Sequence, residues 1–146
     1  MHRLRIALAQ INVTVGDLEG NKQKVLHYLD RARGLGVDLI AFPELVITGY
    51  LPEDLLFKPA FIEANVNCLH EIVVESQGLA AIVGFVDAQD DLYNSAAVIH
   101  DGTLAGVYHK HYLPNYSVFD EDRYFQAGQM SSVFVIRGAA VGVSIC

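Results

Sequence analysis

The sequence contains no tryptophan, only two cysteines and only four prolines among its 146 residues. Cys68 and Cys146 can form at most one disulfide bond, so the chain lacks the cysteine framework of a small secreted domain. No apolar run approaches the roughly 20 residues that a transmembrane helix needs. These absences predict a protein without a membrane span, and we expect it in the cytoplasm.

Positive charge is also scarce. Ten Lys and Arg residues stand against seventeen Asp and Glu residues, which gives a formal net charge of −7. The basic residues form no cluster larger than the pairs Arg3/Arg5 and Arg31/Arg33, so nucleic acid is not an expected partner. Hydrophobic residues make up 52% of the chain and charged residues 18%, which excludes a disordered protein. By composition, this length supports one compact core.

Several common site signatures are missing. The first predicted strand leads into residues 13–17 (VTVGD) instead of a GxGxxG turn, and no GxxxxGK[ST] segment occurs. A Rossmann or P-loop nucleotide site is therefore excluded. His109 and His111 have no third ligand nearby in the sequence, so we predict no metal site.

Apolar periodicity predicts a β-α-β-α pattern followed by antiparallel strands. The first strands are expected at 4–13 and 37–42, and helices over about 19–33 and around 62–73. The strand at 4–13 is apolar on both sides, which predicts that it lies inside a layered fold. Asp101-Gly102 is typical of a two-residue hairpin turn. The pattern predicts an α/β fold in which helices cover one face of a mixed sheet. The later strands are expected at 79–86, 93–100, 104–108, 133–136 and 139–145.

Three reactive side chains stand at the ends of predicted strands. Glu44 follows a buried strand, where a carboxylate is poorly hydrated and suits the role of general base or acid. Lys110 follows another strand, and Cys146 ends the apolar run at 139–145. A free thiol is mostly protonated at neutral pH, so it needs a neighbouring base or cation to react well. Glu44 and Lys110 could supply both.

Each of these residues also has an ordinary interpretation. Glu44 could be a solvated loop carboxylate, Lys110 a surface lysine and Cys146 a small buried thiol. Cys68 lies within a predicted amphipathic helix, where a buried and unreactive thiol is expected. The segment 142–146 (GVSIC) begins like a nucleophile elbow but lacks the last glycine, which argues against Ser144 as a nucleophile.

Three regions of the sequence carry motifs at the ends of predicted strands: 42–45 (FPEL) with 48–50 (TGY), 109–110 (HK) and 142–146 (GVSIC). In these motifs and their order, the sequence resembles the nitrilase (carbon–nitrogen hydrolase) superfamily. The resemblance implies a nitrilase-like α-β-β-α sandwich. It also implies a catalytic triad in which Glu44 is the general base, Lys110 stabilises the oxyanion and Cys146 forms a thioester with the substrate.

Within the superfamily, residues 110–116 (KHYLPNY) and 119–125 (FDEDRYF) resemble the glutaminase domain of glutamine-dependent NAD synthetases. This resemblance implies glutamine as the substrate, with Tyr50 and Tyr116 lining its pocket and Glu121 as a second glutamate beside the triad. It further implies that the released ammonia serves NAD synthesis from nicotinic acid adenine dinucleotide, in an enzyme that forms homo-oligomers.

Nitrilase-like domains continue past their cysteine, whereas this sequence stops there. We therefore expect residues 1–146 to be an incomplete glutaminase domain, weakly active or inactive alone, from a larger enzyme with an ATP-dependent synthetase domain. The glutaminase chemistry needs no cofactor, and ATP and Mg²⁺ belong to the absent synthetase domain. Two alternatives remain. One is another nitrilase-family amidase acting on a small amide, nitrile or carbamoyl compound, and the other is a non-catalytic fragment that packs against a partner.

Overall fold

The computed structural model describes residues 3–146, so the first two residues of the expected domain lie outside the described residues. Five strands form one mixed sheet in the order β1-β2-β3-β4-β5, and β6 and β7 form a separate hairpin. The first three strands are parallel, and β3, β4 and β5 are antiparallel to one another in turn. The strands are β1 (Ile6–Leu8), β2 (Leu39–Ala41), β3 (Ala80–Ala88), β4 (Leu92–His100), β5 (Thr103–His109), β6 (Val133–Ile136) and β7 (Ala139–Gly142).

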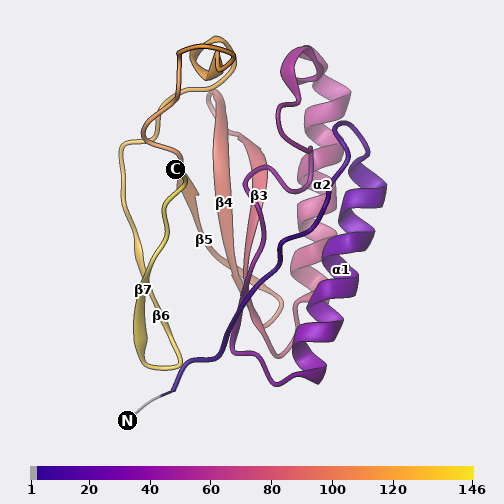
Figure 1. Cartoon of the computed structure of the whole chain (residues 1–146), viewed down its shortest axis with the longest axis vertical. Coiled ribbons are helices and arrows are strands. Elements are labelled where there is room, and N and C mark those ends of the chain that lie inside the picture. Colours follow the sequence, from indigo (N-terminus) through magenta and orange to yellow (C-terminus); the bar gives the residue numbers. More distant parts are fainter. Residues whose placement is uncertain (1–2) are drawn as a thin grey trace.

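Two helices, α1 (Leu18–Gly34) and α2 (Pro59–Glu75), cover one face of the sheet (Figure 1). The Asp17 side chain caps α1 by accepting a hydrogen bond from the Gly20 amide at 3.0 Å. Apolar side chains from both helices and the sheet form the main core, among them Val25, Leu29, Ile40, Leu69, Ile72 and Val83. Within residues 3–146, no helix is both long and apolar enough to cross a lipid bilayer.

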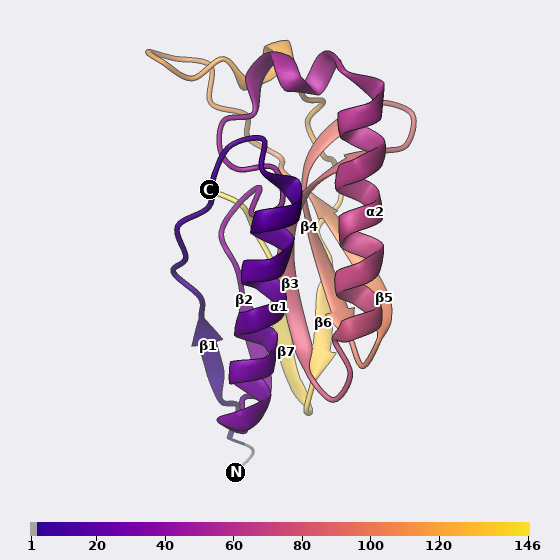
Figure 2. The same ribbon diagram turned by 90° about the vertical axis from the view of Figure 1, so that its right-hand side faces the viewer.

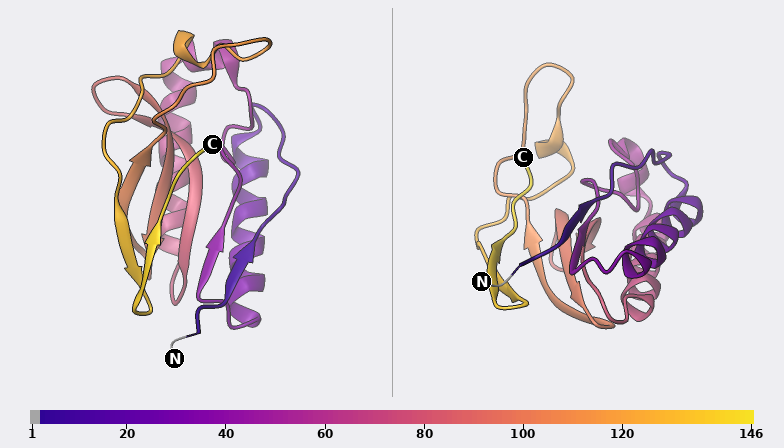
Figure 3. Two further views of the ribbon diagram at one scale, coloured as in Figure 1. Left: turned by 60° about the vertical axis from the view of Figure 1, so that its left-hand side comes forward. Right: turned by 60° about the horizontal axis from the view of Figure 1, so that its bottom comes forward.

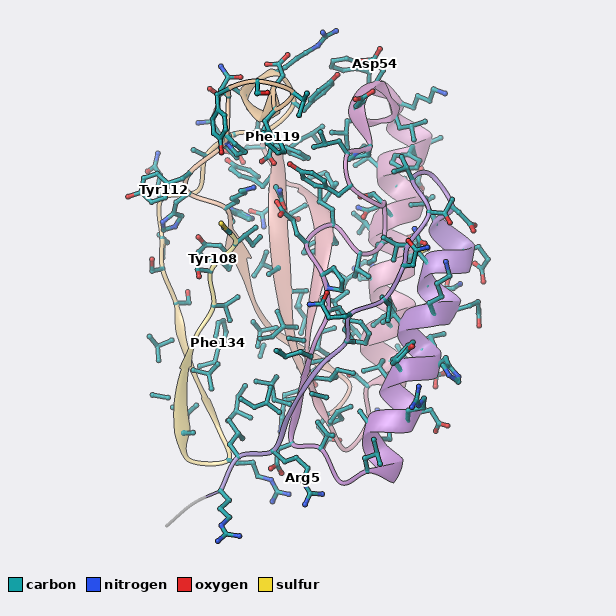
Figure 4. The ribbon with its side chains drawn as sticks, viewed as in Figure 1. Arg5, Asp54, Tyr108, Tyr112, Phe119 and Phe134 are labelled. Carbon is teal, nitrogen blue, oxygen red and sulfur yellow. The ribbon has the colours of Figure 1, made fainter. Side chains whose placement is uncertain are left out.

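The β6–β7 hairpin packs against part of the other face of the sheet, so the layers run from helices through sheet to hairpin (Figure 3). Phe134 of β6 lies on the sheet side of the hairpin (Figure 4), where a Cβ atom on Gly106 of β5 would come within 2.9 Å of its ring. At the hairpin turn, the Arg137 Nε atom donates to Asp38 Oδ1 at 2.8 Å. An aromatic contact and an ion pair therefore fix this hairpin to the sheet.

Most predicted elements are confirmed. Both helices and the strands from β2 to β6 lie within a few residues of their predicted ranges. Asp101 and Gly102 have φ values of 48° and 75°, as a type I′ turn requires. The last strand ends at Gly142, before the predicted end at residue 145.

The prediction for the first strand is wrong in both length and burial. β1 contains three residues, not the ten predicted at 4–13, and it forms the edge of the sheet, beside β2 (Figure 2). Ile6 is 52% exposed and Leu8 is 73% exposed. Ala7 packs against the helix-side core, whereas within residues 3–146 no layer covers the side on which Ile6 and Leu8 lie.

Candidate active site

The loop after β2 places Glu44 directly against β3. Gly84 makes this close approach possible, because a Cβ atom there would lie 2.5 Å from the Pro43 carbonyl oxygen and 2.4 Å from the Leu45 nitrogen. The Ile47 amide donates to the Gly84 carbonyl at 3.3 Å, which holds the loop on the strand. The absence of a side chain at Gly84 therefore sets how closely Glu44 lies to the sheet.

Lys110 comes directly after β5, and its backbone is held on both sides. Its amide donates to the Asn94 carbonyl on β4, and its carbonyl accepts from the Gly128 amide, both at 2.8 Å. Gly128 crosses the end of β5 so closely that a Cβ atom there would lie 2.4 Å from the His109 carbonyl oxygen. The Lys110 side chain is only 1% exposed, so its interpretation as a surface lysine is wrong.

The Lys110 ammonium joins two carboxylates. Its Nζ atom lies 2.7 Å from Glu44 Oε1 and 3.1 Å from Oε1 of Glu121, which belongs to the short 3-10 helix η2 (Glu121–Arg123). The Glu121 side chain is fully buried, and a buried charge requires such a partner. Burial by itself would lower the pKa of Lys110, but the hydrogen bonds and charges of the two glutamates outweigh it and raise that pKa. Lys110 therefore stays cationic at neutral pH.

Two neutral side chains complete this cluster. The Tyr50 hydroxyl donates to Glu121 Oε1 at 2.9 Å, and burial followed by this hydrogen bond raises the pKa of Tyr50 above its usual range. The Asn94 Nδ2 atom donates to Glu44 Oε1 at 2.6 Å. The hydrogen bonds from Asn94 and Lys110 both go to Glu44 Oε1. Within residues 3–146, the other carboxylate oxygen, Oε2, has no hydrogen bond.

Asn94 is the one member of this cluster that the sequence interpretation missed. It lies in the strand predicted at 93–100, where it is fully buried. A polar amide inside an otherwise apolar strand was the available signal, since buried polar groups need hydrogen-bond partners.

A cavity of about 570 Å³ lies in front of the cluster and is bordered by Glu44, Lys110 and Cys146. Its volume is in the range of small-molecule sites. Its rim comes largely from the loop after β5, from which Tyr112 and Phe119 project around the upper end of the sheet (Figure 4). The other lining residues are Tyr50, Leu113, Pro114, Asn115 and Tyr116. Five of the six predicted site residues thus border one cavity, and the sixth, Glu121, lies behind it and binds Lys110 and Tyr50.

Cys146 borders this cavity from a less constrained segment. Strand pairing in the hairpin ends at Gly142, and residues 143–146 continue beyond it. Cys146 is exposed, so its interpretation as a buried thiol is wrong. It also lines a second cavity of about 420 Å³, between the sheet and residues 142–146. Cys68 is buried as predicted, and burial raises the pKa of its thiol.

The remaining candidates engage other partners. His109 Nε2 lies 2.8 Å from Asp87 Oδ2, whereas His111 Nε2 lies 3.0 Å from the Met130 carbonyl oxygen. No group of three or more His, Cys, Asp or Glu side chains in the described part of the chain could hold a metal ion. Ser144 lines only the second of the two cavities.

The sequence matches the family model described as carbon-nitrogen hydrolase over residues 5–146. It is 46% identical over 148 aligned residues to the glutamine-dependent NAD(+) synthetase of Thermotoga maritima, covering 100% of this chain and 26% of that protein. The synthetase of Aquifex aeolicus is also 46% identical, with coverage of 98% and 25%. The chain spans about a quarter of the length of the curated relatives it matches.

Solved structures share the fold. The glutamine-dependent NAD+ synthetase of Acinetobacter baumannii, in complex with adenosine diphosphate, gives a TM-score of 0.93 at 41% identity, covering 98% of this chain and 27% of that one. An amidase from Nesterenkonia sp. gives a TM-score of 0.85 at 23% identity, covering 98% of this chain and 55% of that one, which shows a shared fold. These structures confirm the predicted nitrilase-like fold. Because the family model matches residues 5–146, the chain belongs to the carbon-nitrogen hydrolase family.

Proposed function

We propose that this chain is part of an enzyme that hydrolyses the side-chain amide of glutamine, with Cys146 as the nucleophile. One observation carries the proposal: the Lys110 ammonium, paired with two glutamates, borders the same cavity as Cys146. A carboxylate, a cation and a thiol on one cavity are the groups that a thioester route needs. Similarity to proteins named glutamine-dependent NAD(+) synthetases, at 46% identity, favours glutamine among possible amides.

In the proposed first step, the Cys146 sulfur attacks the amide carbon while Glu44 accepts the thiol proton. The Glu44 Oε2 atom is the acceptor, because Oε1 already binds Lys110 and Asn94. Lys110 stabilises the negative charge that develops on the amide oxygen, a contribution of about 3–4 kcal/mol in comparable sites. Glu44 then gives the proton to the amide nitrogen, the C–N bond breaks and ammonia leaves, so that Cys146 carries a γ-glutamyl thioester.

Water completes the reaction. Glu44 takes a proton from a water molecule while the water oxygen attacks the thioester carbon. Lys110 again stabilises the oxyanion that forms. The C–S bond breaks, the proton passes to the Cys146 sulfur, and glutamate is released. Every group in these two steps is a side chain of this protein or water, so the proposed reaction uses no cofactor.

Three residues are proposed to support these steps. Tyr50 and Tyr116 line the cavity and would bind the substrate. Glu121 holds the Lys110 ammonium and the Tyr50 hydroxyl through Oε1. Its Oε2 atom is buried without a hydrogen-bond partner within residues 3–146, so the proposed role of Glu121 is to hold Lys110 and Tyr50 in place.

We also propose that residues 1–146 form the N-terminal part of a glutaminase domain within a longer NAD synthetase. The chain aligns over its full length with the Thermotoga maritima synthetase but covers only 26% of it, which supports this placement. The longer protein would use the ammonia to amidate nicotinic acid adenine dinucleotide. ATP and Mg²⁺ would serve that amidation, and no step proposed for this chain depends on them.

Location and assembly belong to the same proposal. Two free thiols, Cys68 and Cys146, are compatible with the reducing cytoplasm. On the β6–β7 hairpin, Val133 is 69% exposed and Val135 is 77% exposed. Exposed apolar side chains of this kind favour contact with another protein surface, and we propose a homo-oligomer in the full-length protein.

The proposed function is tested with a diazoketone analogue of glutamine and with glutamine itself. We expect the analogue to alkylate Cys146, detected by peptide mass spectrometry, and glutamine to release ammonia slowly. Cys146→Ala should abolish both signals, whereas the matched thiol variant Cys68→Ala should retain them. Faster turnover of small amides, nitriles or carbamoyl compounds would favour the other amidase. Neither labelling nor turnover of any of these compounds would favour a non-catalytic module.

A further inference from the structure

We propose that Asn94 is a positioning residue that holds the Glu44 carboxylate aligned with Lys110. This inference rests on the proposed function, in which Glu44 is the general base. Asn94 is fully buried in β4, and its Nδ2 atom donates to Glu44 Oε1 at 2.6 Å. Its carbonyl oxygen accepts the Lys110 amide at 2.8 Å. One residue therefore contacts both the side chain of the base and the backbone of the cation.

The sheet fixes Asn94 between the two elements that carry these groups. Asn94 is paired with Val86 on β3, the strand against which the Glu44 loop lies. The next residue of β4, Ser95, is paired with His109 at the end of β5, directly before Lys110. Because β4 is paired with a strand on each side, the position of Asn94 along β4 is fixed relative to the Glu44 loop and to Lys110.

The Oδ1 atom of the Asn94 side chain is buried and makes no hydrogen bond within residues 3–146, which indicates that the amide is not there for packing alone. An apolar side chain of similar size would avoid the cost of that orphaned acceptor. The contact from Nδ2 to Glu44 gives a physical reason for an amide at this position.

The charges around Glu44 explain why a neutral donor is useful there. Lys110 faces Glu44 from the end of β5, but Glu121 on η2 shares the same ammonium. Tyr50 binds Glu121 from the loop after β2, and Cys146 faces the cavity from the segment after β7. Because one cation serves two carboxylates, the Asn94 amide adds a second donor that fixes the position of Glu44 Oε1 without adding a second positive charge.

The experiment compares crystal structures of the native full chain and of Asn94→Ala. Losing the hydrogen bond from Asn94 should free the Glu44 carboxylate to turn, so that Glu44 Oε1 moves away from Lys110 Nζ by more than about 0.5 Å. With glutamine as substrate, kcat should fall about tenfold or more with little change in KM.

Asn65→Ala is the matched control. Asn65 is also fully buried, but both ends of its amide bind the backbone of Val86, at 2.6 and 3.2 Å. This variant should lose stability without changing the distance from Glu44 Oε1 to Lys110 Nζ. If Asn94→Ala does not fold, Asn94→Ser replaces it, because a hydroxyl there is too short to reach Glu44.

The crystal structures separate this inference from the proposed function. A longer distance from Glu44 Oε1 to Lys110 Nζ in the Asn94 variant, and an unchanged distance in Asn65→Ala, support the positioning role even if glutamine is not hydrolysed. An unchanged distance in a folded Asn94 variant overturns the positioning role, even if the native chain is a glutaminase. Equal lengthening in the Asn94 and Asn65 variants also overturns it, because that would report a general loosening of the sheet.

Discussion

The base and cation of the candidate site are held far more firmly than its thiol. Glu44 and Lys110 are joined to each other, and the fully buried Glu121 and Asn94 bind them from behind. Cys146 borders the same cavity from an exposed position, four residues beyond the last paired residue of β7. The two sides of the cavity thus differ in burial, pairing and backbone support.

This difference separates two tasks in building a site of this kind. The sheet positions the acid–base groups while the core forms, so their geometry is set by folding. The position of the thiol depends instead on how residues 143–146 lie over the sheet. Substitutions on the first side should therefore affect stability and chemistry together, and substitutions on the second side should affect chemistry alone.

Lys110→Met should produce the largest loss of stability. It removes the cation between Glu44 and the fully buried Glu121, so we expect the free energy of unfolding to fall by about 3–5 kcal/mol. Denaturation in urea measures this loss. Lys22→Met is the control, since Lys22 is also buried but its partners Glu19 and Glu71 are 67% and 58% exposed. Equal losses in the two variants would contradict the special role of buried carboxylates.

Gly84→Ala should have the next largest effect. The added methyl group would press on the backbone of the Glu44 loop, so we expect a loss of about 1–3 kcal/mol together with reduced glutaminase activity. Gly142→Ala, on the thiol side, is the control, because nothing lies within 4 Å of a Cβ atom there. Thermal unfolding of both variants measures the contrast, and a larger loss from Gly142→Ala would reverse the comparison.

Alkaline pH should have the third-largest effect on stability, because it removes protons from Lys110 and Tyr50. The pKa values of Lys110 and Tyr50 are raised in the folded protein, so the folded state binds these protons more tightly than the unfolded state. Their contribution is complete below about pH 10 and is lost as pH rises through the folded-state values.

The Tyr50→Phe variant isolates the tyrosine part of this effect. Between pH 9 and 11, its free energy of unfolding, measured in urea, should fall less steeply than that of the native protein. Tyr112→Phe should behave like the native protein, because Tyr112 is 87% exposed. Parallel curves for the native protein and Tyr50→Phe would show that Tyr50 does not contribute.

Cys146→Ala should have the smallest effect on stability. Because the thiol is exposed, we expect a change of less than about 0.5 kcal/mol in the free energy of unfolding. Cys68→Ala should cost more, about 1 kcal/mol, because it leaves a cavity beside the main core. Calorimetry compares the two, and a clear loss from Cys146→Ala would show that the thiol side is as firmly held as the base side.

Periodicity predicted the elements but not how far each layer extends. Both helices and most strands follow from apolar repeats and turn residues such as Asp101 and Gly102. The same reasoning failed for β1, since an apolar face indicates that a side chain can be buried but not that a layer reaches it. Ile6 and Leu8 lie on such a face at the sheet edge.

The site was predicted through family resemblance more than through local pattern. Glu44 and Lys110 are 66 residues apart, and nothing in their spacing determines a 2.7 Å contact. Their meeting depends on the strand order and on Gly84, whose closeness to the Glu44 loop is a tertiary property. Asn94 was missed for the same reason, because its partner lies on another element.

The Arg137–Asp38 ion pair at the β6–β7 turn should make the Cys146 side of the site sensitive to salt concentration, unlike the Glu44 and Lys110 side. Arg137, which is 73% exposed on its side chain, binds Asp38 and ties the β6–β7 turn to the start of β2. Dissolved ions screen such an exposed pair but act much less on the buried Lys110 pairs. Rising ionic strength should therefore loosen the hairpin that carries Cys146 while the base and cation stay in place.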